Sequence, residues 1–135
     1  MRRSPKVSDL KRTLEELEGE RWSEPAFPSH LVTTCHRLRK VPIEQLGVED
    51  LRMLLGQAIG VAYLVPLALE ILIANPLAEG DFYPGDLLCS ILRLDSQVWK
   101  KHPDWAERLK CIVSGIETAP RDIGKARDKF LSQEA

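Results

Sequence analysis

The chain has 135 residues, of which 44% are hydrophobic, 29% charged and 6% aromatic, and its net charge is −1 at pH 7. This length and composition predict one globular domain with a sizeable core, and the near-neutral charge argues against non-specific binding to nucleic acid or anionic membranes. Three widely spaced cysteines without a CxxC pair argue against a disulfide framework and favour a reducing, cytoplasmic setting.

The first forty residues predict two helices separated by irregular chain. Ser8 precedes a run of leucines at helical spacing and Gly19 follows it, so we expect a capped helix over residues 9–17. Residues 20–28 contain two prolines and should cross irregularly, with their aromatic side chains docked on the core. A second helix should run from Ser29 to about residue 40, since serine is a favourable N-cap.

The middle of the chain predicts its most apolar helix. A third helix over residues 48–58 should end before Gly60, which marks a break or a close contact between helices. Residues 61–75 are apolar nearly all round, which is typical of a central helix. Glu70 interrupts this apolar segment, so we expect a helix buried in protein, with that carboxylate hydrogen-bonded, and no membrane span.

The remaining sequence predicts four further helical segments: residues 84–92, a turn capped by Ser96, residues 104–116, and a weakly anchored helix over residues 121–132. No segment shows sustained strand alternation. We therefore expect an all-α fold: one domain over residues 1–135, with six to eight helices around a central apolar helix and loose ends at residues 1–7 and 130–135.

Charge is unevenly distributed along the chain. Residues 41–99 contain two basic and eight acidic residues, which gives this segment a net charge of −6, whereas the segments on either side are positive. The most apolar third of the chain is therefore also the acidic third. A protein partner with a basic face would be attracted to it and steered toward it.

Residues 77–88 form an acidic and aromatic loop directly after the apolar helix. Surface loops of this kind often carry function, and we predict that this one contacts a partner through Glu79, Asp81, Tyr83 and Asp86. Tyrosine is frequent at interfaces, so we prefer Tyr83 to Phe82 as the aromatic contact.

Two other interpretations of these carboxylates stay open. Asp81 and Asp86 can cap the helix that follows the loop, with Glu79 merely solvated. Alternatively, Glu70, Glu79, Asp81 and Asp86 can form a divalent-metal or acid–base site in a small metal-binding protein or enzyme.

Catalysis has no positive support in the sequence. The loop contains no serine, cysteine, histidine or lysine, and the Walker, HExxH and GxSxG motifs are missing. Cys35 and His36 are adjacent, so on a helix their side chains do not face each other. We expect no catalytic residue, no cofactor and no bound metal, and we interpret the basic cluster of Arg37, Arg39 and Lys40 as a solvated helix face.

Four segments occur in an order that is distinctive. They are Cys35-His36-Arg37-Leu38-Arg39, residues 51–70 ending in Pro66-Leu67-Ala68-Leu69-Glu70, residues 75–88 with the acidic loop, and Trp99. In these features the chain resembles a family of bacterial contact-dependent growth inhibition (CDI) immunity proteins, and the resemblance covers about residues 30–105.

The resemblance implies a cytoplasmic, non-enzymatic protein that binds the C-terminal toxin domain of a large surface effector and neutralises it. Toxins of such systems are often nucleases, many of them directed at RNA, and we expect a monomer that forms a one-to-one complex. A nuclease active site must hold phosphate and is typically basic. An acidic surface can fill such a site with carboxylates in place of phosphate oxygens.

Overall fold

The computed structural model describes residues 7–23, 29–116 and 121–134, and this part of the chain is helical. It contains eight α-helices and two 3-10 helices, which confirms the expected all-α, single-domain fold. In chain order they are η1 (Val7–Lys11), α1 (Leu14–Glu18), α2 (His30–Leu38), η2 (Ile43–Gln45), α3 (Val48–Gly56), α4 (Val61–Ala74), α5 (Asp86–Leu92), α6 (Ser96–Lys101), α7 (Pro103–Ser114) and α8 (Arg121–Glu134).

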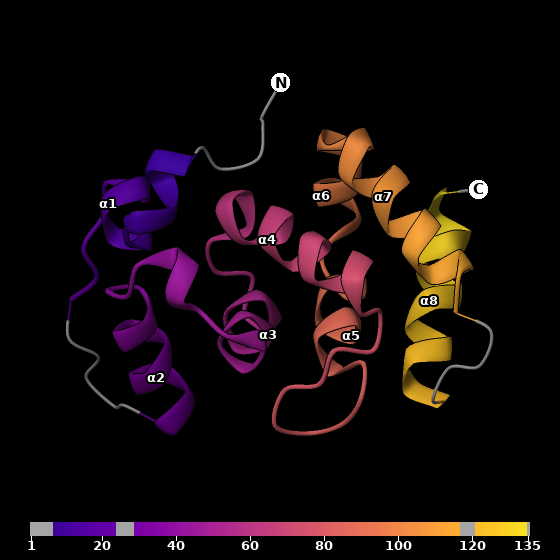
Figure 1. The fold of residues 1–135 in the computed structure, drawn as a ribbon, viewed down its shortest axis with the longest axis horizontal. Helices are drawn as coiled ribbons and strands as arrows, with labels where there is room; N and C mark the ends of the chain where they lie inside the picture. Colours follow the sequence, from indigo (N-terminus) through magenta and orange to yellow (C-terminus); the bar gives the residue numbers. More distant parts are fainter. Residues whose placement is uncertain (1–6, 24–28, 117–120, 135) are drawn as a thin grey trace.

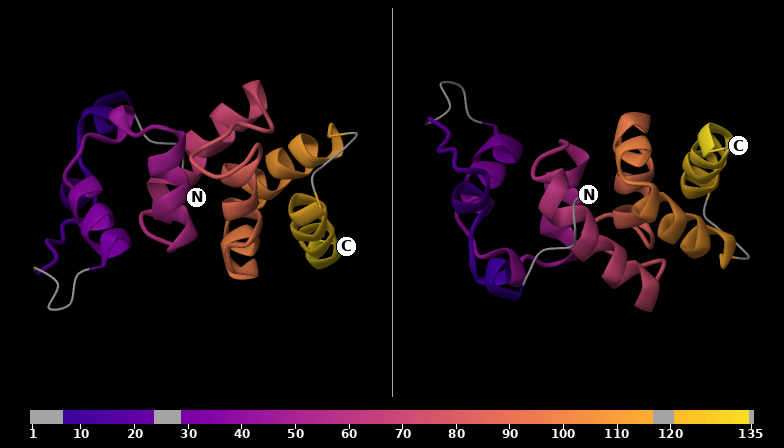
Figure 2. Two further views of the ribbon diagram at one scale, coloured as in Figure 1. Left: turned by 90° about the horizontal axis from the view of Figure 1, so that it is seen from below. Right: turned by 90° about the horizontal axis from the view of Figure 1, so that it is seen from above.

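The helices follow one another along the long axis of the molecule, with α1 and α2 at one end and α7 and α8 at the other (Figures 1 and 2). Between them, α3 packs on both α4 and α5, α4 packs on α7, and α5 also packs on α8. Six of the seven residues of α5 are buried, whereas α4 exposes one side that includes Glu70 and Ile73. The centre is therefore shared by α4 and α5, and α5 is the more enclosed of the two.

The first expected helix is divided into two elements. Residues 7–11 form η1, and α1 begins only at Leu14, because Thr13 closes a capping box. The Thr13 Oγ1 accepts from the Glu16 amide at 3.2 Å, and the Thr13 amide donates to the Glu16 carboxylate at 3.0 Å. This reciprocal pair satisfies two amides at the helix start. Gly19 ends α1 in the left-handed conformation, as predicted.

Arg39 holds α2 against α1 and is buried, so the expected solvated basic face is wrong for this residue. Its side chain is 1% exposed; Nη2 donates to the Glu18 carboxylate at 2.8 Å and to the Glu20 carbonyl at 3.0 Å. The Trp22 ring covers the guanidinium at 4.1 Å, a cation–π contact that docks this tryptophan. The other expected docking residue, Phe27, lies outside the described residues.

Gly60 is both a helix break and a close contact, as the sequence indicated. Its φ of 67° is left-handed, and it immediately precedes α4. A Cβ atom at this position would lie 2.8 Å from both δ carbons of the fully buried Leu14. Glycine is therefore required here for its conformation and for its lack of a side chain.

The C-terminal helices differ from expectation in two details. The Asp95 carboxylate, and not Ser96, caps α6 by accepting from the Gln97 amide at 2.8 Å. Helix α8 extends to Glu134, and Phe130 is fully buried with its ring edge-to-face on Trp99 at 5.4 Å. Residue 130 is thus a core residue, in contrast to the loose end and the weak anchoring that its sequence suggested.

Glu70 does not have the buried, hydrogen-bonded environment that we expected. It lies on the exposed side of α4, because the buried residues of this helix occupy the opposite face. Within the part of the chain that the structure describes, no helix is both long enough and apolar enough to cross a membrane.

Candidate functional site

The chain between α4 and α5 forms a closed loop that projects from the body of the molecule (Figure 1). Because α5 begins at Asp86, the loop expected over residues 77–88 ends at residue 85, and we call residues 77–85 the acidic loop. Glu79 and Pro84 pair in a single antiparallel bridge, and the Gly85 amide donates to the Leu77 carbonyl at 3.1 Å. These two backbone contacts bring the ends of the loop together. They determine its shape jointly with the side chains of Asp86 and Glu49, described next.

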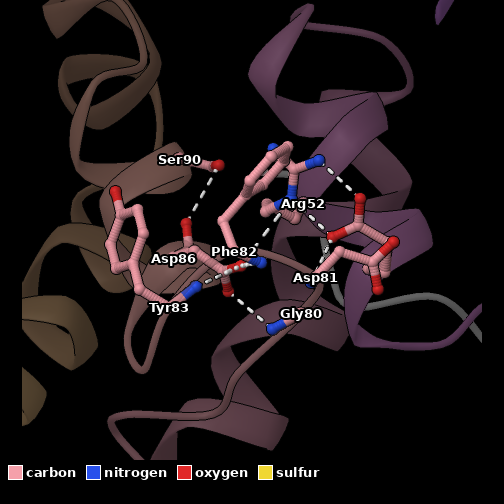
Figure 3. Close-up of polar contacts among 8 residues, drawn as sticks. Arg52, Gly80, Asp81, Phe82, Tyr83, Asp86 and Ser90 are labelled. Atoms are coloured by element: carbon pink, nitrogen blue, oxygen red, sulfur yellow. Dashed lines mark hydrogen bonds and ion pairs between the residues drawn. The ribbon is translucent and has the colours of Figure 1, made fainter.

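Asp86 holds the loop from below. Its Oδ1 accepts from the Gly80 amide at 2.7 Å, and its Oδ2 accepts from the amides of Phe82 and Tyr83 at 3.1 and 3.4 Å (Figure 3). The side chain is 3% exposed. A buried carboxylate with three backbone donors is well satisfied, and it orders four consecutive residues of the loop.

A second carboxylate ties the loop to α3. Glu49 accepts from the Arg52 Nε at 2.6 Å and from Nη2, and the same Glu49 oxygen that faces Nε accepts from the Asp81 amide at 2.9 Å. A Cβ atom on Gly80 would lie 2.5 Å from that oxygen. Because Arg52 and Asp81 fix the Glu49 carboxylate, it cannot move aside easily, so only glycine fits at position 80.

Phe82 is the most exposed aromatic residue of the loop. Its side chain is 67% exposed, and one face of its ring lies over the Arg52 guanidinium at 4.4 Å, as Figure 3 shows. Tyr83, which the sequence favoured as the aromatic contact, is half-buried and packs against the core. By exposure, Phe82 is therefore better placed than Tyr83 to contact a partner, whereas the sequence analysis preferred Tyr83. The sequence held no signal for this, since Arg52 lies thirty residues away.

The four expected contact residues do not share one surface: three lie in the acidic loop, and Asp86 is the first residue of α5. Glu79 and Asp81 are exposed, Tyr83 is half-buried and Asp86 is buried. Helix capping does not explain Asp86, because its carboxylate accepts from loop amides, and α5 has Gly85 as an N-cap without a side-chain hydrogen bond.

The metal-site alternative requires carboxylates that converge. Among the described residues, no group of three or more histidine, cysteine, aspartate or glutamate side chains is placed to hold a metal ion. Glu70 is on α4, and both oxygens of Asp86 face backbone amides.

Cys35 and Cys89 are buried, burial raises the pKa of the Cys35 thiol, and Cys111 is exposed.

The pKa of Glu49 offers a direct test of the contact between α3 and the loop. Hydrogen bonds from Arg52 lower this pKa below its ordinary value; partial burial opposes the effect, while the Asp81 amide and the Arg52 charge add to it. Because the pKa is lower in the folded state, the stabilisation is present above the unfolded value of about 4.3 and is lost as the pH falls through the folded pKa.

We expect a carbon-detected NMR titration to place the Glu49 midpoint below about 4.3, with the Asp81 amide shift following the same curve. The Arg52→Gln variant should return the midpoint toward the unfolded value. A wild-type midpoint at or above the unfolded value would contradict the observed hydrogen bonds.

The fold and the loop define a class: a small helical domain that presents a preorganised acidic and aromatic loop, an arrangement suited to binding a protein. The sequence matches the family of CDI immunity proteins over residues 16–109, which include the whole acidic loop with α3, α4 and α5. The chain therefore belongs to the CDI immunity protein family, as its motifs indicated. No curated protein matches the sequence.

Proposed function

We propose that this protein neutralises its cognate CDI toxin in the cytoplasm by forming a one-to-one complex with the C-terminal toxin domain, and that it does so without catalysis. The family membership supports an immunity function. The observation that carries the binding mode is the acidic loop: the backbone that bears two exposed carboxylates and an exposed ring is held in place in the free protein.

Preorganisation is what makes this loop a good inhibitor surface. Ordering a flexible loop at an interface costs free energy. The contacts of Asp86 and Glu49 order this loop in the free protein, so binding a partner does not require that ordering step. Phe82 provides an aromatic anchor, and Glu79 and Asp81 flank it with negative charge. Such a surface suits a basic pocket of the kind that holds phosphate, so we propose a nuclease, with RNA as its substrate, as the toxin.

Charge reversal on the loop tests the proposal. The Glu79→Lys/Asp81→Lys double variant should weaken toxin binding at least tenfold, because a tenfold change needs only about 1.4 kcal/mol. Phe82→Ala should weaken it about thirtyfold, the loss typical of an aromatic anchor worth about 2 kcal/mol. Calorimetric titration with the cognate toxin domain measures both, and an RNA-degradation assay reports neutralisation.

The matched control is Glu44→Lys/Glu70→Lys, which makes the same change in charge at two exposed acids of the same negative segment, outside the loop. It should keep the wild-type affinity to within about threefold, since exposed charges away from an interface act weakly. Equal weakening by the two double variants would show that only overall charge matters. Wild-type affinity in the loop variants would place the contact elsewhere.

A further inference from the structure

Arg52 is the side chain against which the exposed ring of Phe82 lies, as Figure 3 shows. The guanidinium carbon is 4.4 Å from the ring centroid, which is within the range of a cation–π contact. Because 67% of the Phe82 side chain remains exposed, this contact covers one side of the ring and leaves the rest to solvent. A partner can therefore reach the ring without displacing Arg52.

The guanidinium of Arg52 is itself held in one orientation. Its Nε and Nη2 both donate to the Glu49 carboxylate, and the Asp86 carboxylate lies 3.9 Å from Nε. A planar guanidinium that makes two hydrogen bonds to one carboxylate has its plane fixed. The face that Arg52 offers to Phe82 is therefore already in place in the free protein.

The backbone and the side chain of Phe82 are held by different groups. The Phe82 amide donates to Asp86 Oδ2 at 3.1 Å, which fixes the backbone. That bond does not determine the rotamer of the side chain, because an exposed phenylalanine can occupy more than one staggered χ1 well. The contact with Arg52 selects among these wells. Asp86 thus supports the loop backbone, whereas Arg52 orients the ring.

We propose that Arg52 is a positioning residue for toxin binding, which acts by holding the Phe82 ring in the orientation that the toxin contacts. This inference rests on the proposed function, in which Phe82 is the aromatic anchor of the interface. Immobilising a side chain at an interface costs binding free energy, so an anchor that is oriented in the free protein binds more tightly.

Charge alone predicts the opposite effect of removing Arg52. Residues 41–99 contain two basic residues, Arg52 and Arg93, and have a net charge of −6. Removing either positive charge makes this segment more negative, which favours a basic toxin. A loss of affinity in an Arg52 variant therefore cannot come from the change in net charge.

The orientation of the ring can be measured in the free protein by NMR. Couplings across the χ1 bond of Phe82 should show one predominant rotamer in the wild type and averaging among rotamers in Arg52→Gln. The Gly80 amide should keep its protection from exchange in this variant, because its acceptor Asp86 is retained. This second measurement distinguishes loss of ring orientation from loss of the loop structure.

A double-mutant cycle tests the same inference in toxin binding. In calorimetric titration with the cognate toxin domain, Arg52→Gln should weaken binding about fivefold, the range expected for one side chain that must be ordered on binding. In the Phe82→Ala background the same substitution should change the affinity by less than about twofold, because the ring on which Arg52 acts is gone.

Two further variants complete the binding test. Arg52→Lys keeps the charge but lacks the planar guanidinium, so it should also weaken binding. Arg93→Gln is the matched control, since it removes the other basic residue of the segment at an exposed side chain, and it should not weaken binding. Circular dichroism of the free variants checks that each is folded, and Arg52→Lys carries the test if Arg52→Gln is not.

The outcomes separate this inference from the proposed function. A single Phe82 rotamer in Arg52→Gln would overturn the role of Arg52 alone. Wild-type affinity in the Arg52 variants, or an equal loss of affinity with and without the Phe82 ring, would do the same. Failure of the wild-type protein to bind the toxin domain would overturn the proposed function, and this inference with it.

Discussion

Replacing Asp86 by asparagine is expected to lower the free energy of unfolding by about 3 kcal/mol, the range seen when buried donors lose a charged acceptor. The carboxylate accepts from the amides of Gly80, Phe82 and Tyr83. An amide side chain would turn an NH₂ group toward one side of this cradle and would also remove the negative charge that lies 3.9 Å from Arg52. Urea denaturation followed by circular dichroism measures the loss.

Asp81→Asn is the matched control for this substitution, because it makes the same chemical change in the same loop at an exposed side chain. It should change stability by no more than about 0.5 kcal/mol. If the two variants were equally stable, Asp86 would not be the support of the loop. The amides of Gly80 and Phe82 should also exchange with solvent faster in Asp86→Asn, since their acceptor is lost.

Replacing Phe130 by alanine is expected to destabilise the fold by about 3–5 kcal/mol, the usual cost of removing a buried aromatic ring. The side chain is 0% exposed and meets Trp99 at an interplanar angle of 78°. Because α8 packs on α5, the cavity would open beside the most enclosed helix of the domain. Equilibrium unfolding in urea tests this magnitude.

Lys129→Ala serves as the control, since this neighbour lies on the exposed side of α8. It should leave stability within about 0.5 kcal/mol of wild type. A loss of less than about 1 kcal/mol for Phe130→Ala would mean that α8 is weakly anchored, as its amphipathic but polar sequence first suggested, and that the domain core ends at α7.

Much of the helical framework was predictable because its signals are local. Ser29 begins α2 by accepting from the amide three residues ahead, and Gly19 ends α1 by its own backbone conformation. Gly60 is required both for its local left-handed conformation and for its close contact with the distant residue Leu14. The predicted cap was wrong where two nearby residues could each serve as the N-cap. Thr13, and not Ser8, caps α1, and Asp95, and not Ser96, caps α6.

The composition of the sequence was enough to locate the candidate site. It did not show which residues of the site are exposed and which support the loop. An acidic aromatic segment after an apolar helix was visible in the sequence, and so was the family resemblance. The burial of Asp86 and the exposure of Phe82 depend on Arg52 and Glu49 of α3, which lie about thirty residues earlier in the chain. Arg39 and Glu70 show the same limit, since each has the opposite burial to that suggested by its neighbours in sequence.

Periodicity, caps and motif order were enough to determine that this chain is a helical member of the CDI immunity protein family with an acidic central third. Only the tertiary structure decided which carboxylates face solvent and which support the loop from beneath. Helix formation is governed by residues three or four positions apart, whereas the burial of a charge depends on which distant donors the fold brings within hydrogen-bonding distance of it.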